Sequence, residues 1–393
     1  METRKRLQFD FRSSFRNARR CTVWAVLCLA ACMLGLGISA TADDHKPTII
    51  TFDAPGSGTG PGQGTIPYGI TTTGGIIGYF LDSNSVFHGF VRAPDGAITT
   101  FDAPGAGTGA GQGTWAYGMN PEGAIVGAYV DASDVAHGFL RVPGGKFSTF
   151  DAPDAGTSAG QGTSADDVNA AGTITGGYAD AKGVYHVYLR APYGKFTTFD
   201  APGAGNSPGQ GTFTPTFYGL NPAGVITGYY FDDNAVVHGF LRAPDGAVTS
   251  FDAPGAGTGA FQGTYCWSLN PARWIAGNTV DASNVAHGFS RAPDGTFTIF
   301  DAPGAGTGAN QGTEPSSNNP AGAITGYYVD ANDVCHGYVR APDGKFATFD
   351  APGAGTGAWQ GTFPWGNNPA GAVMGSYVDS NNVNHGFLRL AMR

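Results

Sequence analysis

The stretch from residue 312 to residue 352 alternates short apolar and aromatic runs with residues that favour turns. Four such runs follow one another: GTEPSSNNP, GAITGYYVD, VCHGYVRAP and GKFATFDAP. The connecting sequences NPAG, DAND and PDG suit tight hairpins. Runs of this length, rich in Ile, Val, Tyr and Phe, predict four short antiparallel strands joined by hairpins.

The same four-run pattern recurs along the chain. Its last run carries the phrase Phe-Asp-Ala-Pro or a close variant, which begins at Phe52, Phe101, Phe150, Phe199, Phe251, Phe300 and Phe349. The spacings are 49, 49, 49, 52, 49 and 49 residues, and a fixed period of this size indicates a repeat architecture.

Apolar side chains fall on both faces of these strands, so both faces need cover. A ring of sheets, each packed between two neighbours, provides it. The chain is therefore predicted to be all-β: a seven-bladed β-propeller of four-stranded antiparallel blades. A β-solenoid is the rival fold, but its coils are usually shorter.

The two ends of the repeat region predict how the ring closes. Residues 47–54 form a fourth-strand pattern with no preceding three, and the chain stops after a third-strand pattern. We therefore expect residues 47–54 to complete the last blade. The only insertion, Thr214-Pro215-Thr216, falls beside the long glycine-rich loop, where extra residues are tolerated.

Residues 1–42 lie outside the repeat. Seven Lys or Arg residues precede an apolar stretch that ends in Ala-Thr-Ala, which is the pattern of a secretory signal peptide. We expect cleavage after Ala42 and an exported propeller over residues 43–393. Lipid attachment at Cys32 and retention of the apolar stretch as a membrane anchor are the alternatives.

The charge balance restricts the partners. The chain has a net charge of −9, and removing residues 1–42 leaves 14 basic and 28 acidic residues. Such a surface repels phosphate, so nucleic acid is not an expected partner. Cys266 and Cys335 occupy different offsets in different units, which indicates isolated buried thiols rather than a disulfide framework. We expect a monomer whose mature part does not enter a membrane.

Each unit places a histidine between two aspartates, one six residues earlier and one in the Phe-Asp-Ala-Pro phrase. These histidines are His88, His137, His186, His238, His287, His336 and His385. The imidazole could hydrogen-bond a carboxylate and tie strands together, or the three groups could hold a cation. A metal centre is needed once and this trio occurs seven times, so we expect a structural role, with no metal and no cofactor. The Arg four residues after each histidine is expected to be structural too.

Catalytic motifs are missing from the sequence. His45 is the only histidine outside the repeated position, so no unique histidine within the repeats is available as a general base. The repeated GAGTG loop precedes a predicted strand and not a helix, so no helix N-terminus faces a phosphate there.

The segments GLNPAGVITGYY (219–230) and VVHGFLRAPDG (236–246) resemble the HAF extracellular repeat family. That family is named for a His-Ala-Phe triplet, where this chain has mostly His-Gly-Phe. The likeness covers residues 50–390 and implies an exported bacterial repeat protein. It brings no established activity, substrate or catalytic residues.

The copies differ most where the glycine-rich loop enters the first strand, a strand that lines the central channel of a propeller. The candidate ligand-binding residues there are Trp115, Phe213, Phe261, Tyr265, Trp267, Glu314, Trp359, Phe363 and Trp365. Flat rings beside carboxylates suit sugars, whose C–H faces stack while their hydroxyls hydrogen-bond. Packing between blades is the alternative role for these rings.

These features predict a secreted, non-catalytic binding or scaffold module whose ligand is a carbohydrate or a protein. Two alternatives stay open: a lyase- or hydrolase-like propeller enzyme with a site at the channel mouth, and a structural component of an envelope or matrix.

Overall fold

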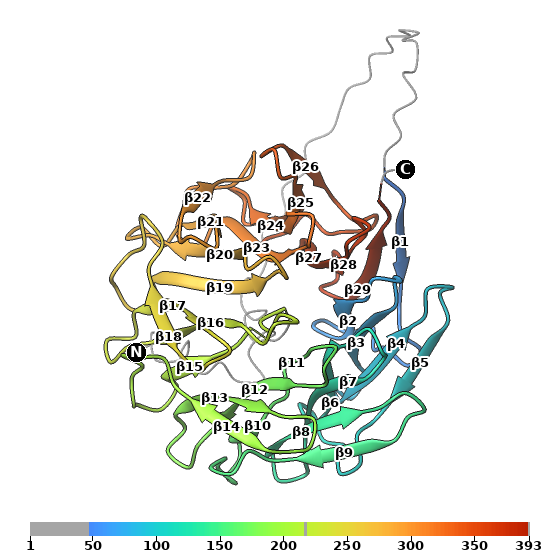
Figure 1. The fold of residues 1–393 in the computed structure, drawn as a ribbon. Helices are drawn as coiled ribbons and strands as arrows, with labels where there is room; N and C mark the ends of the chain where they lie inside the picture. The colour runs from blue at the N-terminus through green and yellow to red at the C-terminus, as the bar shows by residue number, and fades with distance from the viewer. Residues whose placement is uncertain (1–46, 216–217, 392–393) are drawn as a thin grey trace, which may run out of the picture.

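The computed structural model describes residues 47–215 and 218–391, and over these residues the chain is built from β-strands and turns. The strands belong to one hydrogen-bonded sheet that is arranged as a ring, an all-β propeller fold (Figure 1). The predicted signal peptide and Cys32 lie outside the described residues. Within them, no helix is long and apolar enough to cross a membrane.

Strands pair in successive sets, each named here by its innermost strand. The first two sets are β2 (Gly64–Ile70), β3 (Ile76–Leu81), β4 (Phe87–Arg92) and β5 (Ile98–Phe101), then β6 (Gly113–Met119), β7 (Ile125–Val130), β8 (Ala136–Arg141) and β9 (Phe147–Phe150). Next come β10 (Gly162–Thr163), β11 (Asp167–Val168), β12 (Ile174–Ala179), β13 (Tyr185–Arg190) and β14 (Phe196–Phe199), then β15 (Gly211–Phe213), β16 (Ile226–Phe231), β17 (Val237–Arg242) and β18 (Val248–Phe251). The remaining strands are β19 (Gly263–Leu269), β20 (Ile275–Val280), β21 (Ala286–Arg291) and β22 (Phe297–Phe300), then β23 (Gly312–Asn318), β24 (Ile324–Val329), β25 (Cys335–Arg340) and β26 (Phe346–Phe349), then β27 (Gly361–Asn367), β28 (Val373–Val378), β29 (Asn384–Arg389) and β1 (Ile49–Phe52).

The ring closes through the first strand of the described chain. β1 pairs antiparallel with β29, from Ile49 opposite Arg389 to Phe52 opposite Gly386 (Figure 1). The predicted closure by residues 47–54 is therefore confirmed. Neighbouring sets elsewhere meet where the third strand of one set bridges in parallel to the inner strand of the next, as at Phe87 and Gly113.

The hairpin turns are held by the aspartates that end the second strands. In the β3–β4 turn, Asp82 Oδ1 accepts the backbone N–H groups of Asn84 at 2.8 Å and Val86 at 2.9 Å. The same pair of bonds recurs at Asp131 and Asp379, among others. The aspartate side chain thus accepts turn N–H groups that have no partner in the strand ladder. This explains why an aspartate stands at the end of the second strand in each unit.

The glycine-rich loops use their own polar groups. In the loop before β6, Gly109 N–H donates to Gln112 Oε1 at 2.9 Å and Gly107 N–H donates to the Val130 carbonyl at 2.8 Å. The buried Thr114 hydroxyl accepts the Ala103 N–H at 2.9 Å. These loop amides are thus already hydrogen-bonded within the protein.

Neighbouring sets are joined by a repeated contact between arginine and phenylalanine. The Arg that ends each third strand lies over the Phe of the preceding set's fourth strand, with the guanidinium carbon 4.3–5.0 Å from the ring centroid. Arg92 over Phe52, at 5.0 Å, makes this contact across the closure. A cation over an aromatic face is attracted by its quadrupole, so the predicted structural role of the repeated Arg is confirmed.

The core is distributed between the sets. One cluster joins Ile76, Phe80 and Phe90 of the β2 set to Met374 and Leu388 of the β27 set. The second strands are buried on both faces, as their apolar sequences predict. Cys266 and Cys335 are free and buried, as expected of isolated thiols.

Candidate functional site

The inner strands carry a bulge that turns one side chain out of the ladder. The register of β19 on β20 shifts between Cys266 and Ser268, so Trp267 is the extra residue. The corresponding shifts in other inner strands leave out Tyr68, Tyr117, Ser316 and Trp365. Bulges re-aim side chains and are frequent beside functional sites.

Two inner strands present flat aromatic walls. On β19, the rings of Tyr265 and Trp267 stack with centroids 5.8 Å apart and planes 9° apart. On β27, Phe363 and Trp365 stack at 6.0 Å and 12°. All four side chains are half-buried. We call these pairs the β19 wall and the β27 wall.

The indole nitrogens of both walls have partners behind them. Trp267 Nε1 donates to Asn278 Oδ1 at 2.5 Å and Trp365 Nε1 donates to Ser376 Oγ at 3.0 Å. Asn278 and Ser376 lie on the second strands of the same sets. Because the N–H groups are satisfied by the protein, each indole is fixed in orientation. Trp365 also stacks on Tyr68 of the β2 set, with centroids 6.1 Å apart and planes 10° apart.

Between the walls stands a polar strand. β23 packs against both β19 and β27, and Glu314 and Ser316 occupy the positions at which the neighbouring strands carry aromatic residues. Tyr327 Oη donates to Glu314 Oε2 at 2.7 Å, and the Tyr327 ring lies 5.1 Å from that of Phe363. Burial raises the pKa of Glu314. Burial, with a smaller contribution from the charge of Glu314, raises the pKa of Tyr265.

A different polar cluster lies in the sets of β10 and β15. Asp166 is 5% exposed, and its carboxylate accepts the hydroxyl protons of Ser164 and Thr214, the latter at 2.7 Å. Asp167 Oδ2 accepts the Leu220 N–H at 3.1 Å. Burial raises the pKa of Asp166 to about 7 and that of Asp167 to about 6. The cluster binds the inserted segment of the β15 set to the set before it.

The segment after the insertion crosses the centre of the ring. Tyr218 Oη accepts the Ile70 N–H from the β2 set at 3.3 Å, while the Tyr218 carbonyl accepts the Leu269 N–H at 2.8 Å. A Cβ atom at Gly366 would lie 2.5 Å from Tyr218 Oη and 2.7 Å from Met374 Cε, so a side chain there would displace one or both of them. Tyr218 thus fills the centre near the ends of the inner strands. This contact was not predicted from the sequence.

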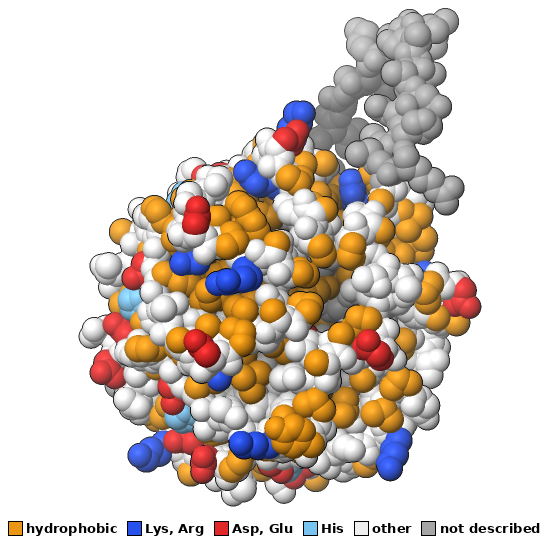
Figure 2. All heavy atoms as spheres, viewed as in Figure 1, with side chains coloured by type: hydrophobic (Ala, Val, Ile, Leu, Met, Phe, Trp, Pro, Cys, Tyr) orange, Lys and Arg blue, Asp and Glu red, His pale blue; other side chains and the backbone are white. Residues whose placement is uncertain are grey.

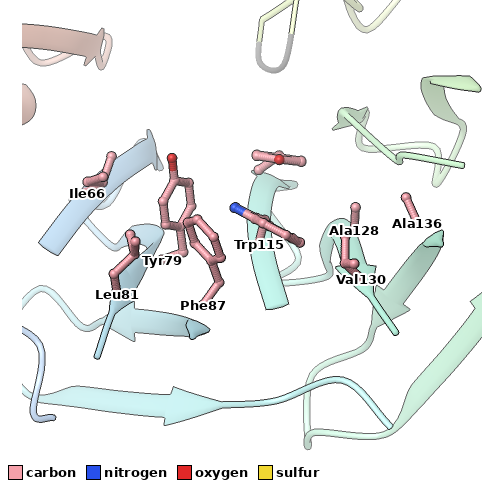
Figure 3. Close-up of a cluster of buried hydrophobic side chains, with 9 residues drawn as sticks. Ile66, Tyr79, Leu81, Phe87, Trp115, Ala128, Val130 and Ala136 are labelled. Carbon is pink, nitrogen blue, oxygen red and sulfur yellow. The ribbon is translucent and has the colours of Figure 1, made fainter. Parts of the chain in front are cut away.

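The structure separates the predicted site residues by exposure. Trp115 is 2% exposed and its ring lies 4.3 Å from that of Phe87 (Figure 3). The expectation that Trp115 belongs to an open aromatic face is therefore wrong, because Tyr79 and Phe87 of the preceding set enclose it. Phe213 is half-buried and stacks on Tyr229 at 5.5 Å and 8°.

Two further predicted residues lie on the loops. Trp359 is 50% exposed, and Phe261 is half-buried with its ring 5.9 Å from that of Phe231. Both have positive φ, 63° and 65°, where the equivalent Gly62 and Gly111 have 80° and 82°. A bulky residue in this region is strained. At both positions the chain therefore carries an aromatic side chain where the backbone conformation favours glycine.

The surface around the centre of the ring is largely apolar. Figure 2 shows hydrophobic side chains gathered about a hollow near the middle of the face that it draws. Of the predicted residues, Phe213, Phe261, Tyr265 and Trp267 pack against one buried cluster. Glu314 is linked through Tyr327 to Phe363 and Trp365. The structure leaves Trp115 in the core and Trp359 on a loop.

Each repeated histidine lies between its two aspartates, as the sequence predicts. In each trio His Nδ1 lies 2.9–3.0 Å from the aspartate of the fourth strand. The distance from Nε2 to the aspartate of the second strand is 3.5–3.8 Å. The hydrogen bond to Asp200 raises the pKa of His186. Among the described residues, no group of His, Cys, Asp and Glu is arranged to hold a metal ion.

Some site residues were missed by the sequence analysis. Tyr327, Asn278 and Ser376 share one position of the second strand, at which the copies also differ: Tyr79, Ala128, Gly177, Tyr229, Asn278, Tyr327 and Ser376. That variation was a usable signal, because a residue directly across the ladder from an inner-strand side chain contacts it. Glu314 pairs with Tyr327 in this way.

Comparison with known proteins identifies the fold but no family. No family model and no curated protein matches the chain. The BP39L lectin from Burkholderia pseudomallei matches with a TM-score of 0.53 and 11% identity, over 88% of this chain and 97% of that one. A six-bladed Aleuria aurantia lectin with a fucose recognition mode matches at 0.38 and 13%, over 78% and 95%. Porphyromonas gingivalis dipeptidyl peptidase 4 matches at 0.44 and 7%, over 80% and 50%. The similarity to the BP39L lectin shows that this chain shares the overall propeller fold of a lectin.

Proposed function

We propose that this chain is a non-catalytic carbohydrate-binding propeller whose successive strand sets are seven blades of four strands. The observation that carries the proposal is the pair of stacked, half-buried aromatic walls on β19 and β27, with Glu314 between them. The apolar faces of a pyranose ring stack on such walls, while its hydroxyls donate to a carboxylate. The fold shared with a lectin is compatible with this function and does not by itself establish it.

The enzyme alternative has one observation in its favour, the polar cluster around Asp166, which is unique among the sets. However, both oxygens of Asp166 accept hydroxyl protons from the protein, and the side chain is buried. A general acid or base must reach the substrate proton. The cluster is better explained as the attachment of the segment that carries Tyr218.

Binding is tested by titrating the full chain with a panel of oligosaccharides and measuring affinity by calorimetry. We expect Trp267→Ala and Trp365→Ala each to weaken binding about 30-fold, the effect of losing a binding residue worth about 2 kcal/mol. Trp274→Ala is the matched control, because Trp274 is exposed on the β19–β20 turn, away from the walls. Retention of full affinity in both wall variants would contradict the proposed site.

The same titration separates the alternatives. Turnover of a bound oligosaccharide would support an enzyme, and retention of a protein but no glycan would support a protein ligand. Failure to bind either would favour a structural role in an envelope or matrix.

We also propose that the protein is an exported monomer of the HAF repeat type. The basic and apolar pattern of residues 1–42 and the repeated NPAG and His-Gly-Phe segments support this. N-terminal sequencing of the exported protein tests it: a mature chain that starts at Asp43 is expected. Size measurement of the same material tests the monomer.

A further inference from the structure

The inner strands carry acidic charge that the protein does not neutralise. The sequences of β2, β6, β10, β11, β15, β19, β23 and β27 contain no Lys or Arg, whereas they contain Asp167 and Glu314. Among the described residues, Glu314 forms no ion pair, and its carboxylate accepts a hydrogen bond from the hydroxyl of Tyr327 at 2.7 Å. A half-buried carboxylate with one neutral partner is costly, and a cation would offset that cost.

The surroundings of Glu314 favour a ligand that carries a positive charge and also has apolar faces. The β19 wall and the β27 wall flank β23, and Tyr327 contacts the β27 wall through Phe363 at 5.1 Å and Trp365 at 6.1 Å. Aromatic faces attract cations through their quadrupole, most strongly where water is excluded. The net charge of −9 also attracts cations over a long range.

The other acidic groups near the centre do not serve this purpose. Both oxygens of Asp166 accept protein hydroxyls, and Asp167 accepts the Leu220 N–H. Glu314 therefore differs from them, because it lies between two aromatic surfaces and has a single bonded oxygen in the described structure.

We propose that the sugar bound at this site carries a free amino group, so that its ammonium pairs with Glu314 while its ring stacks on the walls. The ligand class is a deacetylated amino sugar, such as an oligomer of glucosamine. The inference rests on the proposed carbohydrate-binding function and narrows it to one substrate class.

The test compares two tetrasaccharides by calorimetry on the full chain, one of glucosamine and one of N-acetylglucosamine, at a pH where the free amine is protonated. The glucosamine tetrasaccharide should bind at least about 10-fold more tightly, which corresponds to about 1.4 kcal/mol. Its affinity should fall as salt is added, because salt screens the charge pair.

Glu314→Gln keeps the shape of the side chain and an oxygen that can accept from Tyr327, and it removes the charge. It should remove the preference for the glucosamine tetrasaccharide. Glu122→Gln, at an exposed turn, is the matched control and should keep the preference. Melting curves of each variant check that it folds.

The outcomes distinguish this inference from the function on which it rests. Equal affinity for the two tetrasaccharides in the unaltered chain, or an unchanged preference in Glu314→Gln, overturns the amino-sugar inference and leaves carbohydrate binding intact. If the chain binds neither tetrasaccharide nor any oligosaccharide of the wider panel, both the amino-sugar inference and the proposed carbohydrate binding are overturned. The comparison on the unaltered chain decides even where Glu314→Gln does not fold.

Discussion

The third strands and the inner strands of this ring follow opposite rules. Third strands repeat the same contacts: each histidine meets its aspartate, and each arginine covers the phenylalanine of the preceding set. Inner strands place Tyr, Trp, Ser or Asp at one equivalent position. The histidine contacts build each set and the arginine contacts join it to the next, so both recur around the ring and stay uniform. Side chains at the centre meet different neighbours, so each can differ.

The largest effect is expected from opening the uniform part of the ring. Deleting residues 43–54 removes β1, and with it the Phe52 ring beneath Arg92 and the partner strand of β29. The loss should exceed about 4 kcal/mol, because emptying one core aromatic site already costs about 3–5 kcal/mol. Thermal unfolding and size measurement check it. A deleted chain with an unchanged midpoint that stays monomeric would contradict closure by β1.

A pair of tryptophans tests whether burial or position decides the role of an aromatic residue. Trp115→Ala should cost about 3–5 kcal/mol, because its site in the core is left empty. Trp359→Ala should change stability by less than about 0.5 kcal/mol, because the side chain is 50% exposed. Denaturant unfolding of both variants measures the difference. Similar losses in the two would remove the distinction drawn here between core and loop aromatics.

The polar side of the centre should respond to pH. The pKa of Asp166 is about 7 in the folded chain and about 4 in an unfolded one, so the folded state holds the proton more tightly. Asp166 therefore contributes most to the free energy of unfolding below about pH 4, and this contribution is lost as the pH rises to about 7.

Asp166→Asn should reduce that loss by roughly 2–3 kcal/mol, somewhat less than the full linkage value for a shift of this size. Free energies of unfolding measured across this pH range provide the check. Asp154→Asn, at an exposed loop position, is the control and should leave the profile unchanged. A profile of Asp166→Asn identical to that of the unaltered chain would show that the carboxyl titrates as in the unfolded chain.

A small effect is expected at a repeated trio. If the aspartate partners of His238 were buried, His238→Ala would cost roughly 1–3 kcal/mol, because it would leave them unsatisfied. However, Asp252 is 54% exposed and can bind water once the imidazole is gone. We therefore expect about 0.5–1 kcal/mol, the range for an exposed polar pair, measured by denaturant unfolding. A loss above about 2 kcal/mol would mean that the trio is more buried in solution than the structure shows.

The framework was predictable from sequence because it repeats. The four strand patterns within each period, and the unpaired patterns at residues 47–54 and at the last third strand, were enough to predict strand pairing and closure. The partner of each arginine was not predicted from the repeat. Phe199, for example, belongs to the preceding unit and contacts Arg242 only when the two strand sets pack together.

The centre was only partly predictable. Strand alternation marks Trp115 and Tyr265 as equivalent inward positions, yet one is buried and the other half-buried, because exposure depends on Phe87 in one case and on Tyr229 in the other. Tyr218 was not predictable, because a three-residue insertion changes how far a segment reaches and not only where it starts. Glu314 was identified, but its partner Tyr327 was missed.

The pairing of β1 with β29 also has a consequence for how the molecule is made. The first described strand to leave the ribosome is completed by the last one, with nearly the whole chain between Ile49 and Arg389. Contacts of such long sequence separation form slowly, and until then β1 and the growing ring expose unpaired edges that are prone to aggregate. During synthesis from the N-terminus the sets can therefore form one by one, but the ring cannot close until β29 has been made. The ring becomes a single cooperative unit only in one late step, and a chain that ends before residue 384 never reaches it.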